Sequence, residues 1–219
     1  MRLIRFRPLK NGDDLNHLKE TIKKNQFYCS NFLDMNDPME GVFTTTDIAN
    51  INNVFSGKNS FKICSFTGDG SLNNPLLWGY YANGFKGAAI EVEVRVSNIK
   101  EIIKNKKGII KVNYVSQNKF NNIIKNLADA NETALNILSR KLTYWKHEKE
   151  YRFFAQSEKN FHEIGEIKKI YFGDPYGTLK NKESIIEASS KYNRYLESRE
   201  ILENVCNDKN ILFGYINFR

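Results

Sequence analysis

Strand patterns and helix patterns are interleaved along the whole sequence, but they do not follow the regular alternation of βαβ units. Strand-type runs are predicted at 3–7, 26–30, 61–66, 87–96, 108–115, 150–155, 166–172 and 211–218. Apolar residues at helical spacing predict helices at 13–22, 75–82, 119–144 and 182–204. This irregular interleaving favours an α+β fold in which helices flank a mostly antiparallel, split sheet.

The chain has 219 residues and no Pro/Ser-rich linker, repeat or low-complexity tract, so we expect a single domain over residues 1–219. No apolar run approaches the roughly 18 residues that a membrane span needs. Residues 1–8 alternate charged and apolar side chains and lack the apolar stretch of a signal peptide, so we expect a cytoplasmic protein without a membrane partner. Cys29, Cys64 and Cys206 have neither zinc nor CxxC spacing, which indicates reduced, mostly buried thiols.

The sequence carries a net charge of +8, which favours anionic partners such as nucleic acid or an acidic protein. Lys, Asn and Ile are abundant throughout, as an AT-rich coding bias would make them, and such a bias adds lysines without any function. The net charge by itself therefore does not decide between contact with nucleic acid and a coding bias without function.

The densest polar cluster lies at 145–154, where the predicted long helix gives way to a strand. If Glu148 already lies in extended chain, a period of two puts Glu148, Glu150 and Arg152 on one face. Two carboxylates about 7 Å apart beside a guanidinium must be solvated, paired or held in a pocket. The alternative is an exposed strand edge with alternating charges.

A second cluster, at 78–87, is rich in aromatic residues. Neighbours on a helix point about 100° apart, so Trp78, Tyr80 and Tyr81 cannot all face one core stripe. We expect at least one of these rings at a cleft or at the surface, and the alternative is that they serve only as packing. In the first strand, Arg7 is suited to grip a phosphate through two hydrogen bonds, or to pair with one of the two acids.

Several familiar functional motifs are absent from the sequence. It has no GxxxxGK[ST] phosphate loop, no GxGxxG after a strand, no HExxH and no GxSxG. His17, His147 and His162 are isolated from one another, and we expect no metal site. Residues 36–40 (Asn-Asp-Pro-Met-Glu) fit a turn fixed by an Asx-type bond and a rigid proline, with substrate contact as the alternative.

Several blocks of the sequence, in order, resemble a bacterial domain family of unknown function that is often met beside phage-defence genes. The family pattern has Tyr-Arg at the end of a first strand, a Phe-Asn-Asp-Pro-like loop, a Cys-Phe-Ser-like strand, Trp-x-x-Tyr-Ala-x-x-x-x-Gly and Trp-x-x-Glu-x-Glu-Trp-Arg. The corresponding residues are Phe6-Arg7, Met35 to Glu40, Cys64-Ser65-Phe66, Trp78 to Gly87 and Trp145 to Arg152. The sequence departs from the pattern at Met35, in the order of Ser65 and Phe66, and at Tyr151.

That family in turn resembles the ADP-ribosyltransferases, which take an Arg or His from an early strand, a Ser, Thr or Tyr from a middle segment and a Glu from a late strand. The resemblance implies an ADP-ribosyltransferase-like fold and NAD as a substrate. It implies that Glu150 stabilises an oxocarbenium-like ribose and that Glu148 orients or deprotonates the acceptor, although an exchange of these two roles stays open. The implied NAD-binding residues are Arg7 for the pyrophosphate, Ser65 or Thr67 from the middle strand, and Tyr81 or Tyr80 for the nicotinamide.

The resemblance further implies a toxin or an anti-phage defence effector, and the positive charge suggests RNA or DNA as the acceptor, with protein as another. An antitoxin or inhibitor protein is an expected partner. Two alternatives stay open. One is a non-catalytic module of the same fold that binds nucleic acid or a partner, and the other is a metal-dependent nuclease that uses Glu148, Glu150 and Asp37.

Overall fold

The structure is a computed structural model, and it describes residues 1–35, 41–120, 123–124, 129–177, 179–180, 183–184 and 189–217. The backbone contacts divide the chain into two compact units, each built from separate stretches of sequence. Unit 1 comprises Met1, Phe27–Thr67 and Arg95–Ile164, and unit 2 comprises Arg2–Gln26, Gly68–Val94 and Gly165–Arg219. The two units are described in turn.

The main sheet of unit 1 has three antiparallel strands. Strand β10 (Glu150–Gln156) lies in the middle, between β4 (Phe61–Thr67) and β6 (Lys107–Lys111). The register places Arg152 opposite Ser65 of β4 and opposite Ile110 of β6. Because β10 has a neighbour on both sides, its side chains are buried along the whole strand up to its last residue.

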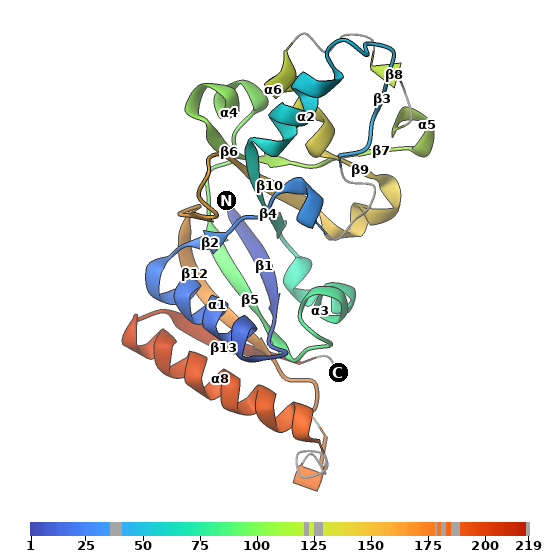
Figure 1. Cartoon of the computed structure of the whole chain (residues 1–219). Coiled ribbons are helices and arrows are strands. Elements are labelled where there is room, and N and C mark those ends of the chain that lie inside the picture. Colours follow the sequence, from blue (N-terminus) through green and yellow to red (C-terminus); the bar gives the residue numbers. More distant parts are fainter. Residues whose placement is uncertain are drawn as a thin grey trace. The chain divides into compact units, whose positions relative to one another are not determined.

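Three helices of unit 1 lie together at one end of these strands: α2 (Ile51–Asn59), α4 (Ile99–Asn105) and α6 (Ala130–Leu138) (Figure 1). Apolar residues of α4 and α6 join the strands in one core, and Val54 of α2 packs on Ile137 of α6 in a second cluster. The first core contains Phe32, Phe61, Ile63, Ile102, Ala134, Leu135, Leu138 and Phe154. A Cβ atom at Gly57 would lie 2.9 Å from the carbonyl oxygen of Ala130. Glycine therefore permits the close approach of α2 and α6.

The remaining elements of unit 1 are short. Three two-stranded pairs join β2 (Phe27–Tyr28) to β11 (Phe161–His162), β3 (Thr44–Thr45) to β8 (Ile123–Ile124), and β7 (Asn113–Val115) to β9 (Arg140–Leu142). The short helices are η1 (Phe32–Asp34), α5 (Gln117–Phe120) and η3 (Thr143–Glu148), of which η1 and η3 are 3-10 helices.

Unit 2 contains a four-stranded sheet in the order β13 (Leu212–Ile216), β12 (Glu166–Gly173), β5 (Gly87–Glu93) and β1 (Arg2–Pro8). The pairs β1–β5 and β5–β12 are antiparallel, and β12–β13 is parallel. Helix α8 (Ser190–Asp208) contacts β13 and lies beside α1 (Gly12–Lys24), as Figure 1 shows. The short helices η2 (Ser71–Asn73) and α3 (Pro75–Tyr81) complete the unit, and α3 contacts β1.

The core of unit 2 is built around Trp78, which is fully buried. Its ring contacts Phe6 edge to face at 5.2 Å and stacks on Phe85 at 5.6 Å between centroids. Its indole N–H donates a hydrogen bond of 2.7 Å to the carbonyl oxygen of Leu72. A buried tryptophan with its one polar atom satisfied is a core residue, and this packing fixes α3 against β1.

The prediction of an α+β fold with mostly antiparallel sheets is confirmed, and the single domain over residues 1–219 stays a prediction. Asn74 caps α3, with Pro75 in its first turn. Helix α1 is capped by Asn11, whose side chain accepts the Asp14 N–H. The three cysteines are free and buried, as expected.

Three predicted elements are wrong in extent. A single helix over 119–144 does not form, because β8, β9 and η3 interrupt it, and α6 carries the apolar helical stripe among the described residues of this range. The predicted strand at 108–115 is split at Val112 into β6 and β7, which have different partners. The last long helix begins at Ser190 after its cap at Ser189, well beyond residue 182. Helices α2 and α4 were not predicted.

No helix in the described residues is both long and apolar enough to cross a membrane.

Candidate active site

Four charged side chains of unit 1 form a buried ion cluster: Lys141, Glu148, Glu150 and Arg152. The Lys141 ammonium lies 2.7 Å from Glu148 Oε2 and 3.0 Å from Glu150 Oε2, so it bridges the two carboxylates. Arg152 holds Glu150 with two hydrogen bonds, Nε to Oε1 at 2.7 Å and Nη2 to Oε2 at 3.1 Å. Both glutamates are only 3% exposed, and Arg152 is 0% exposed.

The backbone brings the two glutamates together by a route that the sequence pattern did not predict. Glu148 ends η3 and is not in extended chain. Lys149 follows with a left-handed backbone (φ 48°), and Glu150 then begins β10. The expected alternation from Glu148 is therefore wrong, although both carboxylates still reach one ammonium. The alternative of an exposed strand edge is also wrong, because β10 lies between two strands and both acids are buried.

Residues of β4 and β7 supply two hydroxyl groups around Glu150. The Ser65 side chain, from β4, hydrogen-bonds the Glu150 carboxylate. The Tyr114 hydroxyl accepts the Glu150 backbone N–H at 2.7 Å. Burial opposes ionisation of Glu150, but the Arg152 and Lys141 cations outweigh burial and lower the pKa of its carboxyl to about 2. Glu150 is therefore a permanent anion at any biological pH.

The same surroundings shift the pKa values of Lys141 and Tyr114. Burial by itself would lower the pKa of the Lys141 ammonium, but Glu150 and Glu148 outweigh it and raise that pKa. Burial raises the pKa of the Tyr114 hydroxyl to about 12. With two carboxylates and two cations, the cluster is neutral as a whole, and Lys141 also lies over the Trp145 ring at 5.1 Å.

These charges restrict what each glutamate can do chemically. A carboxyl with a pKa of about 2 is a poor proton acceptor near neutral pH, because efficient general bases have a pKa near the working pH. A fixed anion is nevertheless suited to stabilise a developing positive charge. Glu150 therefore fits an electrostatic role better than a proton-transfer role.

The other predicted NAD-binding residues, Arg7, Tyr80 and Tyr81, belong to unit 2. Arg7 is half-buried in β1, opposite Ala88 of β5. Tyr80 is 61% exposed, whereas Tyr81 is partly buried and packs on the core around Trp78. The two tyrosine rings meet edge to face at 6.2 Å. The expectation that at least one aromatic residue of this helix reaches the surface is thus confirmed by Tyr80.

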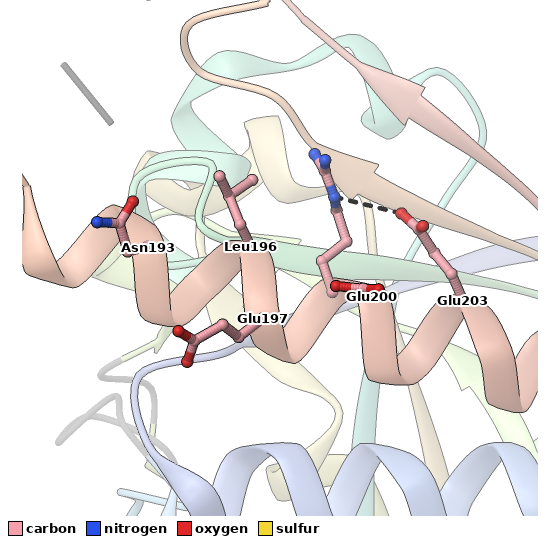
Figure 2. Close-up of a pocket in the computed structure, with 6 residues that line it drawn as sticks. Asn193, Leu196, Glu197, Glu200 and Glu203 are labelled. Carbon is pink, nitrogen blue, oxygen red and sulfur yellow. Dashed lines mark ion pairs between the residues drawn. The ribbon is translucent and has the colours of Figure 1, made fainter. Parts of the chain in front are cut away.

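A shallow depression of about 530 Å³ lies over α8 in unit 2, and Figure 2 shows its lining. Arg199 forms an ion pair with Glu203, Nε to Oε1 at 3.2 Å. None of the residues predicted to bind NAD lines this depression, so it gives no support to an NAD site. The lining residues are Asn193, Leu196, Glu197, Arg199, Glu200 and Glu203.

The sequence did not predict Lys141, which completes the ion cluster, or Tyr114, which accepts the Glu150 backbone N–H. Nothing local singled out Lys141, because Arg140 and Lys146 are further cations between α6 and the acids. The segment 36–40, which was predicted to form a turn, lies outside the described residues. Within the described residues, no three His, Cys, Asp or Glu side chains are grouped as metal ligands would be.

Comparison with known proteins adds one finding. No curated protein and no solved structure gives a significant match to the chain. A family model described as "Protein of unknown function (DUF2971)" matches residues 77–153, a segment that contains the whole aromatic block at 78–87 and all four members of the ion cluster. Residues 77–153 are thus similar to a family whose function is unknown.

Proposed function

We propose that the protein is an NAD-dependent ADP-ribosyltransferase with an ADP-ribosyltransferase-like fold, and that Glu150 is its catalytic anion. One observation carries the proposal. Glu148, at the end of η3, and Glu150, the first residue of a late strand, contact the same ammonium, and Ser65 of a middle strand hydrogen-bonds Glu150. This Ser and Glu-x-Glu set is the one that the resemblance implies for the enzyme.

In the proposed reaction, the bond between nicotinamide and the ribose C1 atom breaks, and its electron pair leaves with nicotinamide. The ribose becomes cationic, and the permanent anion of Glu150 stabilises that charge. An acceptor nucleophile then bonds to C1 and loses its proton to Glu148.

The proposal assigns the remaining roles to residues of unit 2. Arg7 neutralises the pyrophosphate, and Tyr81 or Tyr80 stacks on nicotinamide. The acceptor is nucleic acid, RNA or DNA, as the positive charge of the chain suggests. The enzyme acts in the cytoplasm as a toxin or an anti-phage effector, under the control of an antitoxin or inhibitor protein.

The test measures nicotinamide release and transfer of labelled ADP-ribose from NAD to RNA, DNA and protein of a cell extract. We expect Glu150→Gln to abolish both signals and Glu148→Gln to reduce transfer more than nicotinamide release. Glu158→Gln, at an exposed position of the same unit, is the matched control and keeps full activity. Circular dichroism shows that each variant is folded. Absence of nicotinamide release and of label transfer in the wild-type protein would overturn the proposal.

The burial of both carboxylates favours a second candidate, a non-catalytic module that binds nucleic acid or a partner. In that case the cluster is a structural ion network, and its cations already neutralise both acids. Glu150→Gln would then lower stability but leave binding and the cellular effect unchanged at a temperature where the variant is folded. The catalytic candidate predicts the opposite, a folded variant without cellular effect.

A further inference from the structure

The net charge of the chain is concentrated in one stretch of sequence. Residues 95–128 contain eight basic side chains and one acidic side chain, Glu101, so this stretch carries +7 of the total +8. A uniform compositional bias would spread the excess lysines over the whole chain, with acids between them. The concentration therefore calls for a cause other than composition.

Four of these cations lie on α4 and β6 of unit 1, and Lys106 lies between the two elements. The apolar side of α4 packs into the core, where Ile102 is fully buried and Ile99 and Ile103 are partly buried. The opposite side carries Lys100 and Lys104, both exposed and one helical turn apart. We call the exposed cations of this region the basic surface; its members are Arg95, Lys100, Lys104, Lys106, Lys107 and Lys111.

The single acid of the region is occupied by the backbone and by Arg95. Glu101 Oε2 accepts the backbone N–H of Asn98 at 2.9 Å, as part of the capping box that starts α4. Its other carboxylate oxygen lies 3.5 Å from Arg95. In the part of the chain that the structure describes, no ion pair joins the five lysines of the basic surface to an acid. Their positive charge is therefore left to face solvent.

Strand β6 sets the spacing of the second row of cations. Lys106 ends α4 with a left-handed backbone (φ 57°), and the chain then enters β6 at Lys107. At about 3.3 Å per residue, Lys107 and Lys111 are roughly 13 Å apart along the strand. Gly108 permits the close approach of α4 to β6, because a Cβ atom at this position would lie only 2.8 Å from the Ile102 side chain. The helix row and the strand row are thus fixed relative to each other.

We propose that the basic surface binds the phosphate backbone of nucleic acid. The inference rests on the proposed function, for which it names the surface that holds the acceptor. Apart from Val96 at 37% exposed, the run from Arg95 to Lys111 carries no exposed large hydrophobic residue on which bases could stack. Contacts are therefore with phosphates, and binding depends strongly on salt and little on base sequence.

The test uses the full chain without NAD and measures the fluorescence anisotropy of a labelled mixed-sequence RNA and of the corresponding DNA. The test variant is Lys104→Ala/Lys107→Ala. The matched control is Lys23→Ala/Lys191→Ala, which removes the same charge from exposed positions of unit 2. We expect the test variant to bind about tenfold more weakly near 0.1 M salt and its salt slope to fall by roughly 1.4, that is about 0.7 per lost single-strand contact. The control binds like the wild type.

Each other outcome overturns the inference. Equal weakening of binding in the two variants would show that only the net charge matters. Absence of binding by the wild type would show that the basic surface does not bind nucleic acid. Capture by phosphatidylserine vesicles through the same lysines, without binding of RNA or DNA, would assign the surface to a membrane. Because no NAD is present, failure here leaves nicotinamide release by the wild type untouched, and so the two proposals fail separately.

Discussion

The ion cluster and the basic surface are two charged regions of the same unit, and they treat charge in opposite ways. In the ion cluster, two carboxylates and two cations are buried, paired and neutral overall. On the basic surface, five lysines are exposed and face one acid that the backbone and Arg95 already hold. The same kinds of side chain therefore stabilise the fold in one region and leave an unbalanced field in the other.

The difference is one of desolvation. Removing a charge from water costs several kcal/mol, so the buried cluster holds only while every member has its partner. An exposed lysine keeps its water and has no such requirement. Loss of one group should therefore damage the cluster severely and the basic surface hardly at all, and this contrast can be tested on the free energy of unfolding.

The largest effect is expected for Arg152→Met. This change leaves the Glu150 carboxylate buried without its main partner and the Leu138 carbonyl without its donor. Removal of one member of a buried ion pair costs about 3–5 kcal/mol. Urea denaturation measures the loss, and Arg194→Met, at a less buried site on α8, is the control with a small effect. A loss below about 1 kcal/mol in Arg152→Met would mean that water reaches the cluster.

Lowering the pH tests the same ion pairing of Glu150 without removing any side-chain atoms. The folded pKa of Glu150, about 2, lies below its ordinary value of 4.5, so its contribution to stability is present above pH 4.5 and is lost as the pH falls towards 2. The contribution is on the order of 3 kcal/mol at most. Urea midpoints measured across this window should fall more steeply for the wild type than for Glu150→Gln. Parallel curves would contradict the depressed pKa.

The sequence predicted the strands of the fold better than its helices. The strand patterns located β1, β4, β5, β10 and β12 because their buried faces leave strong runs of apolar residues. The prediction of one long helix at 119–144 was wrong, because apolar residues keep a helical spacing through segments that pair as strands. Hydrogen bonding to a partner strand is a tertiary choice that local periodicity does not contain.

The candidate site was predictable in its residues but not in its geometry. The spacing of Glu148, Glu150 and Arg152 drew attention to the correct segment. Their burial depends on Lys141, which reaches them through β9, and on the left-handed turn at Lys149. Neither feature has a local signal, because lysine is common throughout the chain and seldom adopts a positive φ. The concentrated charge of residues 95–128, by contrast, was readable in the sequence.

A smaller effect is expected where the basic surface is attached to the fold. Asn98→Ala removes the side-chain cap of α4, which accepts the Glu101 N–H at 3.0 Å. Loss of such a cap costs about 1 kcal/mol. Urea denaturation should show this loss, whereas the low-pH behaviour due to Glu150 should stay as in the wild type. A change in that behaviour would mean that α4 and the ion cluster are coupled, and the contrast between the regions would be less sharp.

The smallest effect is expected for Lys104→Ala/Lys107→Ala, the variant that should weaken binding to nucleic acid. Both side chains are exposed and face like charges, so their removal relieves repulsion while it costs little packing. Surface substitutions of this kind change stability by about 0.5 kcal/mol or less. The urea midpoint should therefore match that of the wild type, and added salt should make the two proteins still more alike because it screens the repulsion. A loss above about 1 kcal/mol would show that these lysines hold the fold together, and weakened binding in this variant would then reflect damage to α4 and β6.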